Sequence, residues 1–273
     1  MQYKLIVCDL DGTLLDSNAN LSQENYDAIT ELAERGIIFV PNTGRSFNEA
    51  PACVREHPAV KYFISSNGAV VQDIENGIIS QNLIPQEIVG EINKMARKCQ
   101  LLCTNHKENR TFVSKLHMND DAMREHHVSD YFRNQIYTCT HPIDDFYDYF
   151  DASGPCEMIA GCFKTEKLKR EFFEVVGKIP NIRVTETGNC IEIVSAFAGK
   201  DTGIKSLIDA LGISVNEIIT IGDGENDFNM IKMTPNSVAV SNASQELKSV
   251  AGHIGVSNDE HIVKHVLENM IKR

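Results

Sequence analysis

Two aspartates stand one residue apart in the segment VCDLDGTLLD, residues 7–16, where an apolar run ends. Because side chains alternate faces along an extended strand, Asp9 and Asp11 point the same way, while Leu10 between them points into the core. Two adjacent carboxylates repel each other, and a divalent cation between them removes that repulsion. Gly12 then lets the chain leave the strand at a sharp angle. The pair predicts a metal-assisted reaction, with solvated turn acids as the alternative, since Asp-Gly is also common in turns.

The second predicted strand is followed by groups that could bind an anion. The segment NTGRS supplies the hydroxyl of Thr43, the backbone amide of Gly44 and the guanidinium of Arg45. Further along, GKDTG places the ammonium group of Lys200 at the start of a predicted helix, where the helix dipole also favours an anion. Hydroxyl, amide and ammonium groups are those that bind phosphate oxygens. For Arg45, a substrate contact and a structural pairing stay open as alternatives.

A further group of acids ends another predicted strand in GDGEND, residues 222–227. It contains Asp223, Asn226 and Asp227, and carboxylates bind hard, oxygen-seeking cations. An EF-hand loop is excluded by spacing, because a loop starting at Asp223 would have Phe228 at its sixth position. The segment also lacks the last glycine of a dinucleotide-binding fingerprint. Together the segments supply the groups that metal-assisted phosphoryl transfer requires.

The residues with these groups lie at the ends of strands or the starts of helices in a predicted α/β domain. Apolar runs and helical periodicities alternate up to residue 66 and again after about residue 188. The predicted strands are residues 4–8, 37–42, 61–66, 190–195, 217–222 and 237–240. The predicted helices are residues 22–35, a short one from 47, 202–211, 226–233 and one from 260. The fold class is therefore α/β, with a doubly wound, Rossmann-like parallel sheet whose functional crevice lies at the carboxyl ends of its strands.

Between these two halves the pattern changes. Asn76-Gly77 between two short strands is a strong hairpin signal, and Pro85 opens a new helix. From there to about residue 187 strands and helices do not alternate strictly, which suits an α+β unit over an antiparallel sheet. We therefore predict an α/β core domain with an inserted α+β domain, at residues 1–82 with 189–273 and at residues 83–188, respectively.

Charge and composition limit the class of protein. The formal net charge of −12 argues against nucleic acid as a partner, because nucleic-acid binders carry a basic face. No apolar run approaches the ~18 residues of a membrane span. The N-terminal apolar run is cut off by an acid and lacks a small-residue cleavage site, so we expect a cytoplasmic protein without a membrane partner. The eight cysteines contain no C-x-x-C motif, which predicts reduced, mostly buried thiols.

The segments DLDGTLLD, TGR, a lysine before a helix and GDGENDFNM follow one another along the chain. In this order they resemble the four motifs of the haloacid dehalogenase-like phosphohydrolase superfamily. The length and place of the insertion resemble the Cof-type branch, which has a type IIB cap. This resemblance covers essentially the whole chain. It implies a cap that closes over the site, excludes water during the first step and selects the substrate.

The resemblance also implies a role for each residue. Asp9 would be the nucleophile that forms an aspartyl-phosphate, and Asp11 the general acid and then the base for the hydrolytic water. Mg²⁺ would be held by Asp9, the backbone carbonyl of Asp11 and Asp223. Asp227 would orient Lys200 or a metal-bound water. The phosphoryl oxygens would be bound by Thr43, Gly44, Lys200, the main chain at Leu10 and the amide of Asn226.

These expectations describe a Mg²⁺-dependent phosphatase of small phosphorylated metabolites, above all sugar phosphates, that acts as a monomer or a small homo-oligomer. Two alternatives stay open. A phosphomutase would use the same intermediate but return the phosphoryl group to the sugar. A non-catalytic sensor of phosphorylated ligands would have no need of Asp11. Asn67-Gly68 follows the third predicted strand near the same edge of the sheet, where a substrate contact is a further alternative.

Overall fold

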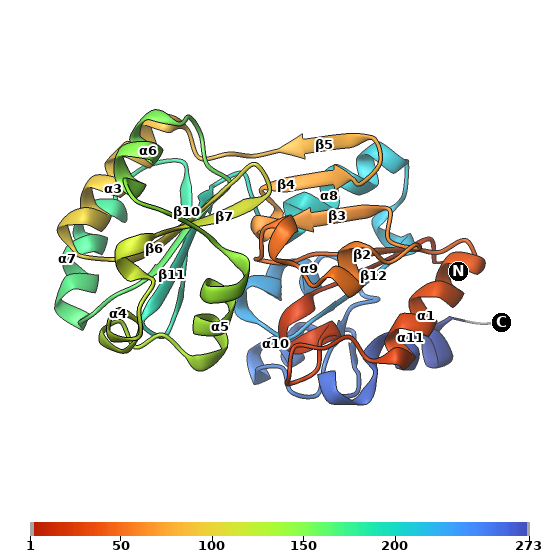
Figure 1. The fold of residues 1–273 in the computed structure, drawn as a ribbon. Helices are drawn as coiled ribbons and strands as arrows, with labels where there is room; N and C mark the ends of the chain where they lie inside the picture. The colour runs from red at the N-terminus through yellow and green to blue at the C-terminus, as the bar shows by residue number, and fades with distance from the viewer. Residues whose placement is uncertain (1–2, 272–273) are drawn as a thin grey trace. The chain divides into compact units, whose positions relative to one another are not determined.

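The computed structural model describes residues 3–271, and the chain divides into two compact units (Figure 1). The core unit consists of the chain up to Gly44, the segment Ala50–Ser80 and the chain from Gly199 onward. The inserted unit consists of Arg45–Glu49 and Gln81–Ala198. The chain therefore passes between the units four times, after Gly44, Glu49, Ser80 and Ala198.

The core unit is built on a parallel sheet with the strand order β14-β13-β12-β1-β2. The strands are β1 (Leu5–Cys8), β2 (Ile38–Pro41), β12 (Ile218–Gly222), β13 (Val238–Ala239) and β14 (His253–Ile254). Every residue of β1 and β12 is buried, as expected for parallel strands that are covered on both faces. The parallel order confirms the predicted α/β fold class, and it brings the carboxyl ends of β1, β2 and β12 to one edge of the sheet.

A second, three-stranded sheet follows in the core unit, with the order β3-β4-β5. Its strands are β3 (Tyr62–Ser65), β4 (Val70–Asp73) and β5 (Gly77–Gln81). An isolated parallel bridge from Asn42 to Ile64 joins β3 to the segment after β2. Gly77 has a left-handed φ of +102°, and the adjacent strands β4 and β5 confirm the hairpin that Asn76-Gly77 predicted.

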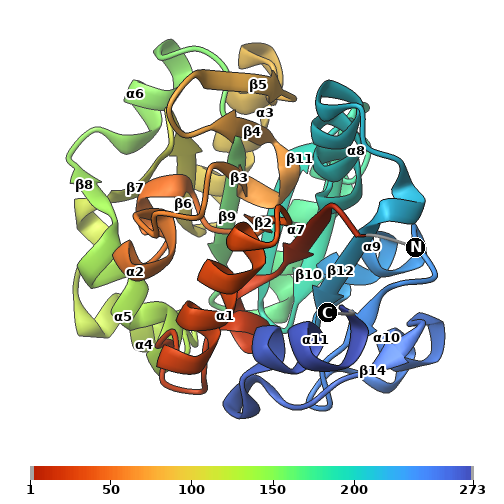
Figure 2. The ribbon, with the colours of Figure 1, turned by 90° about the vertical axis from the view of Figure 1, so that its right-hand side faces the viewer.

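The helices of the core unit are α1 (Gln23–Glu34), α2 (Ala52–Arg55), α8 (Lys200–Leu211), α9 (Phe228–Lys232), α10 (Gln245–Val250) and α11 (Ile262–Met270). The first begins where predicted, because the side chain of Ser22 accepts a hydrogen bond from the amide of Asn25. Helices α1 and α11 lie side by side (Figure 2). Helices α8 and α9 pack on Leu5 and Val7 of β1 through apolar side chains that include Ile204 and Met230. The packing of α8 fixes the position of its first residue, Lys200.

The inserted unit has a six-stranded sheet with the order β10-β11-β9-β6-β7-β8. Neighbouring strands are antiparallel except for β7 and β8. The strands are β6 (Leu102–Lys107), β7 (Arg110–Ser114), β8 (His141–Ile143), β9 (Met158–Cys162), β10 (Ile182–Thr187) and β11 (Cys190–Ser195). This is the α+β unit over a largely antiparallel sheet that the sequence predicts.

Helices lie on both faces of this sheet and bury separate apolar clusters. Helices α3 (Gln86–Lys98), α6 (Phe146–Ala152) and α7 (Glu166–Val176) share one cluster with Ile159 and Ile193 of the sheet. Helices α4 (Asp120–Glu125) and α5 (Asp130–Cys139) share a smaller one with Leu102 and Val113. With these two clusters, the inserted unit has an apolar core that is separate from that of the core unit. None of the helices between residues 3 and 271 has the length and apolar character needed to cross a bilayer.

The predicted start of the second core segment, residue 189, was wrong. The strand Cys190–Ser195, expected in the core sheet, pairs antiparallel with β9 and β10 of the inserted unit. An apolar strand pattern does not specify its partner, and here a hairpin partner lies only a few residues upstream. The chain returns to the core unit at Gly199, and Arg45–Glu49 also belongs to the inserted unit.

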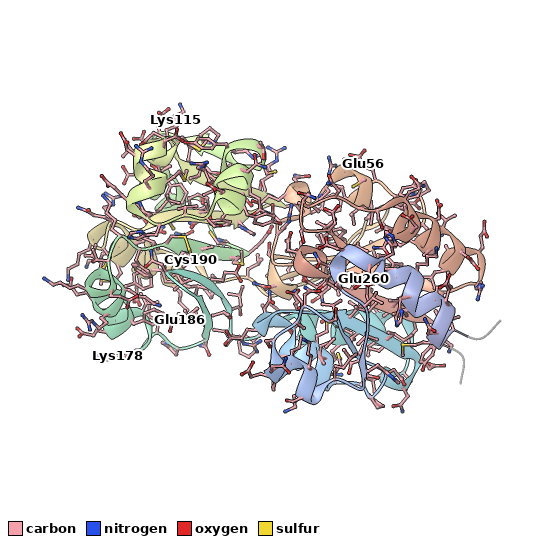
Figure 3. The ribbon with its side chains drawn as sticks, turned by 90° about the horizontal axis from the view of Figure 1, so that it is seen from below. Glu56, Lys115, Lys178, Glu186, Cys190 and Glu260 are labelled. Atoms are coloured by element: carbon pink, nitrogen blue, oxygen red, sulfur yellow. A yellow bond between two sulfur atoms is a disulfide. The ribbon has the colours of Figure 1, made fainter. Side chains whose placement is uncertain are left out.

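The prediction that the cysteines are all reduced was wrong for one pair. Cys162 of β9 and Cys190 of β11 lie directly opposite each other and form a disulfide, which is visible near the label of Cys190 in Figure 3. The two residues are 28 positions apart in the sequence, so no short motif reveals them. Their proximity arises from the register of two strands that the sequence assigned to different domains.

Candidate active site

Parallel strands of the core sheet end where the predicted site residues lie. Asp9 follows β1, Asp223 follows β12, and Thr43 comes shortly after β2. Because β1 lies between β12 and β2, these three segments are neighbours in space. The amide of Asp9 still donates to the carbonyl oxygen of Ile221 at 3.0 Å, which fixes the point at which the chain leaves the sheet.

The chain turns away from β1 over Leu10–Leu14, where the backbone of Asp11 and Gly12 is not helical. Gly12 in this turn has a left-handed φ of +76°, which only glycine adopts without strain. A Cβ atom at this position would lie 2.6 Å from Oδ2 of Asp223. Glycine is therefore required at position 12 for two reasons: the left-handed backbone and the close approach of the Asp223 carboxylate.

A buried group of charges forms the centre of the site. The ammonium group of Lys200 donates to Oδ1 of Asp9 at 2.5 Å and to Oδ1 of Asp227 at 2.7 Å. The three residues are only 2%, 5% and 0% exposed, respectively. The second oxygen of Asp227 accepts hydrogen bonds from the amides of Asp223 and Gly224, both at 3.0 Å. Both oxygens of Asp227 are thus occupied, one of them by Lys200, and its role in orienting Lys200 or a metal-bound water stays a prediction.

The surroundings shift the pKa of each of these groups. Burial raises the pKa of Asp9 well above its ordinary value; Asp227 raises it further and Lys200 opposes the shift. Burial and the charge of Asp227 also raise the pKa of Asp223. Burial alone would lower the pKa of Lys200, but the two neighbouring carboxylates outweigh it, so the pKa is raised and the lysine stays charged. When all three carboxylates are ionised, their negative charge exceeds the single positive charge of Lys200, and this repulsion contributes to the raised pKa values.

A divalent cation fits this excess of negative charge. Asp9, Asp223 and Asp227 each offer an oxygen within 4.8 Å of the others, and no other such group of three occurs among residues 3–271. The hydroxyl of Thr13 donates to Oδ1 of Asp223 at 2.8 Å and so orients this carboxylate. Carboxylate oxygens are the ligands that hard cations prefer. Since the oxygens of Asp227 are used by Lys200 and two amides, Asp9 and Asp223 are the side chains best placed to hold the cation. The ligand role of the Asp11 carbonyl stays a prediction.

The predicted phosphate-binding residues also lie in the core unit, with one exception. Thr43 is 1% exposed, and its amide donates to the carbonyl oxygen of Ile64 at 3.0 Å, which ties the segment to β3. Lys200 begins α8, as the sequence predicts. Asn226 lies in the helical turn Glu225–Asp227 after β12. Their contacts with a phosphate group stay a prediction.

The exception is Arg45, which belongs to the inserted unit. Its guanidinium donates to the carbonyl oxygen of Glu49 at 3.1 Å and to the hydroxyl of Tyr131 at 2.5 Å. With the Gln135 carboxamide oriented to face it, the oxygen of Gln135 accepts from Nε and Nη2 of Arg45 at 3.1 and 3.0 Å. Arg45 is therefore paired with residues of its own unit, and its contact with a substrate stays a prediction.

Two asparagines outside the predicted catalytic, metal-binding and phosphate-binding residues support the site. The side chain of Asn42 is fully buried, and its Nδ2 donates to the carbonyl oxygen of Lys200 at 3.1 Å, which anchors the start of α8. Oδ1 of Asn67 accepts from Nδ2 of Asn226 at 3.0 Å. A signal for Asn67 was present, because Asn-Gly directly follows a predicted strand. Nothing local marks Asn42, whose partner is 158 residues away.

Comparison with known proteins places these features in a family. A model described as haloacid dehalogenase-like hydrolase matches residues 6–267 of the chain. A Bacillus subtilis (strain 168) protein, 5-amino-6-(5-phospho-D-ribitylamino)uracil phosphatase YwtE, is 26% identical over 282 residues, which covers 98% of each chain.

Solved structures share the complete fold. The structure of the HAD subclass IIB sugar phosphatase BT4131 aligns with a TM-score of 0.81 at 19% identity, over 97% of this chain and 98% of that one. A haloacid dehalogenase-like hydrolase from Bacteroides thetaiotaomicron aligns with the same TM-score at 25% identity, over 99% of this chain and 100% of its own. These matches show that the chain shares its fold with a subclass IIB structure, as the resemblance predicts.

Proposed function

Because the chain belongs to the haloacid dehalogenase-like hydrolase family, we propose that it hydrolyses phosphate monoesters of small metabolites with Mg²⁺ as its cofactor. The observation that carries the proposal is the buried group of Lys200, Asp9 and Asp227 beside Asp223. A protein that only bound phosphate would gain from the lysine. It would gain nothing from buried acids that repel the phosphate and cost desolvation energy.

The reaction takes place in two steps. A carboxylate oxygen of Asp9 attacks phosphorus, the bond from phosphorus to the ester oxygen breaks, and Asp11 donates its proton to that oxygen. Water then attacks the phosphorus of the aspartyl-phosphate while Asp11 takes a proton from the water. The bond between phosphorus and Asp9 breaks, which releases inorganic phosphate and restores both carboxyl groups. Two displacements with a covalent intermediate replace one difficult displacement.

The remaining groups hold the phosphoryl oxygens. Asp227 keeps Lys200 beside Asp9, so its positive charge lies where the negative charge of the transferring group develops. The other donors are Thr43, Gly44, the main chain at Leu10 and the amide of Asn226. Asp9, Asp223 and the carbonyl of Asp11 would hold Mg²⁺, which would neutralise a further part of this charge.

The substrates we propose are phosphorylated sugars and related polyols. The relative YwtE is named for a phosphorylated ribityl compound, and the structure of BT4131 is that of a sugar phosphatase. We further propose that residues of the inserted unit decide which leaving group is accepted. The core unit supplies the groups for phosphoryl transfer, which are the same for every ester.

The test is phosphate release from p-nitrophenyl phosphate and from a panel of sugar phosphates and nucleotides, with Mg²⁺ and with EDTA. The variant Asp9→Asn removes the nucleophile, and Asp27→Asn is the matched control on an exposed position of α1. We expect turnover that requires Mg²⁺, disappears in Asp9→Asn and persists in Asp27→Asn. Folded protein that binds Mg²⁺ but releases no phosphate from any compound would contradict the proposal and favour a mutase or a sensor.

A further inference from the structure

Three consecutive residues after β3 have a left-handed backbone. The φ angles of Ser66, Asn67 and Gly68 are +50°, +52° and +83°, and only glycine adopts this region freely. The turn between β6 and β7 also has two left-handed residues, Glu108 and Asn109, but neither of these is buried. Ser66 and Asn67, by contrast, are 0% and 6% exposed. Strained backbone in a buried turn is held by its surroundings, and such strain collects at functional sites.

The turn is fixed to the segment that contains Thr43 and Gly44. The amide of Asn67 donates to the carbonyl oxygen of Thr43 at 3.0 Å, and the amide of Thr43 donates to Ile64 at 3.0 Å. The side chain of Asn67 lies against Gly44, because a Cβ atom on Gly44 would be 3.3 Å from Oδ1 and 3.5 Å from Nδ2 of Asn67. Any residue larger than glycine at position 44 would therefore press on this side chain.

The same turn touches the start of α8. A Cβ atom on Gly68 would lie 2.0 Å from the carbonyl oxygen of Gly199, the residue before Lys200. On a third side, Oδ1 of Asn67 accepts from Nδ2 of Asn226 at 3.0 Å. All these residues belong to the core unit. The turn thus contacts three of the four segments that make up the site.

We propose that Asn67 is a positioning residue for phosphoryl transfer, which rests on the proposed function. A carboxamide has a donor end and an acceptor end, and the two can exchange by rotation of the group. Since Asn67 presents an oxygen to Asn226, it holds the donor end of Asn226 on its own side. A second hydrogen on the same nitrogen stays available for a phosphoryl oxygen. Without Asn67, the amide can turn its oxygen toward the phosphate, where it repels.

The test is a double-mutant cycle on kcat/KM. Asn67→Gly removes the side chain and keeps the left-handed backbone, and Asn226→Ala removes the group that is positioned. We expect each variant to lower kcat/KM by up to about 100-fold, the order of loss for a misplaced catalytic group. Because Asn67 acts through Asn226, the double variant should lose no more kcat/KM than Asn226→Ala does alone. The matched control is Asn181→Gly, another left-handed asparagine, which is exposed and lies in the inserted unit.

Two outcomes would overturn the proposal. Losses that multiply in the double variant mean that Asn67 does not act through Asn226. An unchanged kcat/KM with a lowered melting temperature means that Asn67 only stabilises the turn. The affinity for inorganic phosphate, measured by calorimetry with Mg²⁺, separates this proposal from the proposed function. We expect weaker binding in Asn67→Gly and wild-type binding in Asn181→Gly, even if no ester is turned over. Wild-type protein that neither binds phosphate nor turns over contradicts both.

Discussion

The buried charges of the core site contrast with an exposed ion pair of the inserted unit. In the core site, Lys200 pairs with Asp9 and Asp227 where all three are almost completely buried. In the inserted unit, the pair of Arg97 and Asp148 joins side chains that are 55% and 72% exposed. Buried charges cost desolvation energy and persist where a task requires them, whereas exposed pairs cost and contribute little. The proposed chemistry assigns such a task to Lys200, Asp9 and Asp227.

The largest expected effect comes from the variant Lys200→Met. It leaves Asp9 and Asp227 buried without their cation, which costs about 3 to 5 kcal/mol of the free energy of unfolding. The same variant should also lose the hydrolysis of phosphate esters. The control is Lys205→Met on the same helix, whose pair with Asp209 is exposed and contributes less than about 1 kcal/mol. Urea unfolding measures both changes, and equal losses in the two variants would contradict the contrast between buried and exposed charges.

The next effect concerns the inserted unit. Replacing both Cys162 and Cys190 by serine should lower the free energy of unfolding by about 2 to 4 kcal/mol, because the unfolded chain regains the freedom of the closed loop. Turnover of p-nitrophenyl phosphate should stay close to wild type, since the reacting groups lie in the core unit. Cys53→Ser, at an exposed free thiol, is the control. Labelling of all eight cysteines in unreduced protein would show that the disulfide does not form.

A smaller effect distinguishes backbone strain from a close approach within the core unit. Gly12 and Gly36 have the same φ of +76°, but a Cβ atom meets Asp223 at Gly12 and nothing within 4 Å at Gly36. Alanine should cost about 1 to 2 kcal/mol at either position through left-handed strain. Only Gly12→Ala should also raise the Mg²⁺ concentration needed for half-maximal activity. If Gly36→Ala raises it equally, the contact with Asp223 is not the cause.

The smallest effect is a dependence of stability on pH when Mg²⁺ is removed. The pKa values of Asp9 and Asp223 are raised in the folded protein, so the unfolded chain releases these protons at lower pH. Stability is then greatest where both groups are protonated and falls as pH rises through their folded-state pKa values. The raised pKa of Lys200 acts only at alkaline pH, above its unfolded value.

Melting temperatures in EDTA and in Mg²⁺ measure this dependence. Mg²⁺ should stabilise the protein more at about pH 8 than at about pH 5, because it offsets the repulsion of ionised carboxylates. Asp9→Asn should reduce the difference between the two conditions. A stabilisation by Mg²⁺ that does not vary with pH would contradict the assignment of these carboxylates to the cation.

Much of the core unit could be predicted because its signals are local. Asp9 ends an apolar strand, Lys200 begins a helix and Asp223 ends another strand, and parallel sheets bring such ends to one edge. The type and spacing of these residues therefore predict a shared site. The same pattern also predicted that the site lies at the edge of the core sheet where the carboxyl ends of its strands meet.

The features that could not be predicted depend on partners far away in the sequence. The pairing of β11 with β9 and β10, the disulfide and the assignment of Arg45–Glu49 to the inserted unit all follow from tertiary packing. A guanidinium bound by Tyr131, more than eighty residues later, has no local signature. The role of Asn67 falls between these cases, because Asn-Gly marks the turn but not the amide that it contacts.

The central claim, that Asp9 is the nucleophile, is tested most directly by trapping the intermediate. In Asp11→Asn the base for the hydrolytic water is removed, while p-nitrophenolate is stable enough to leave as an anion, without a proton from an acid. A short reaction of this variant with p-nitrophenyl phosphate, quenched in acid and analysed by peptide mass spectrometry, should show one phosphoryl group on Asp9. A burst of p-nitrophenol with the phosphoryl group on another residue, or with none on the protein, would contradict the account.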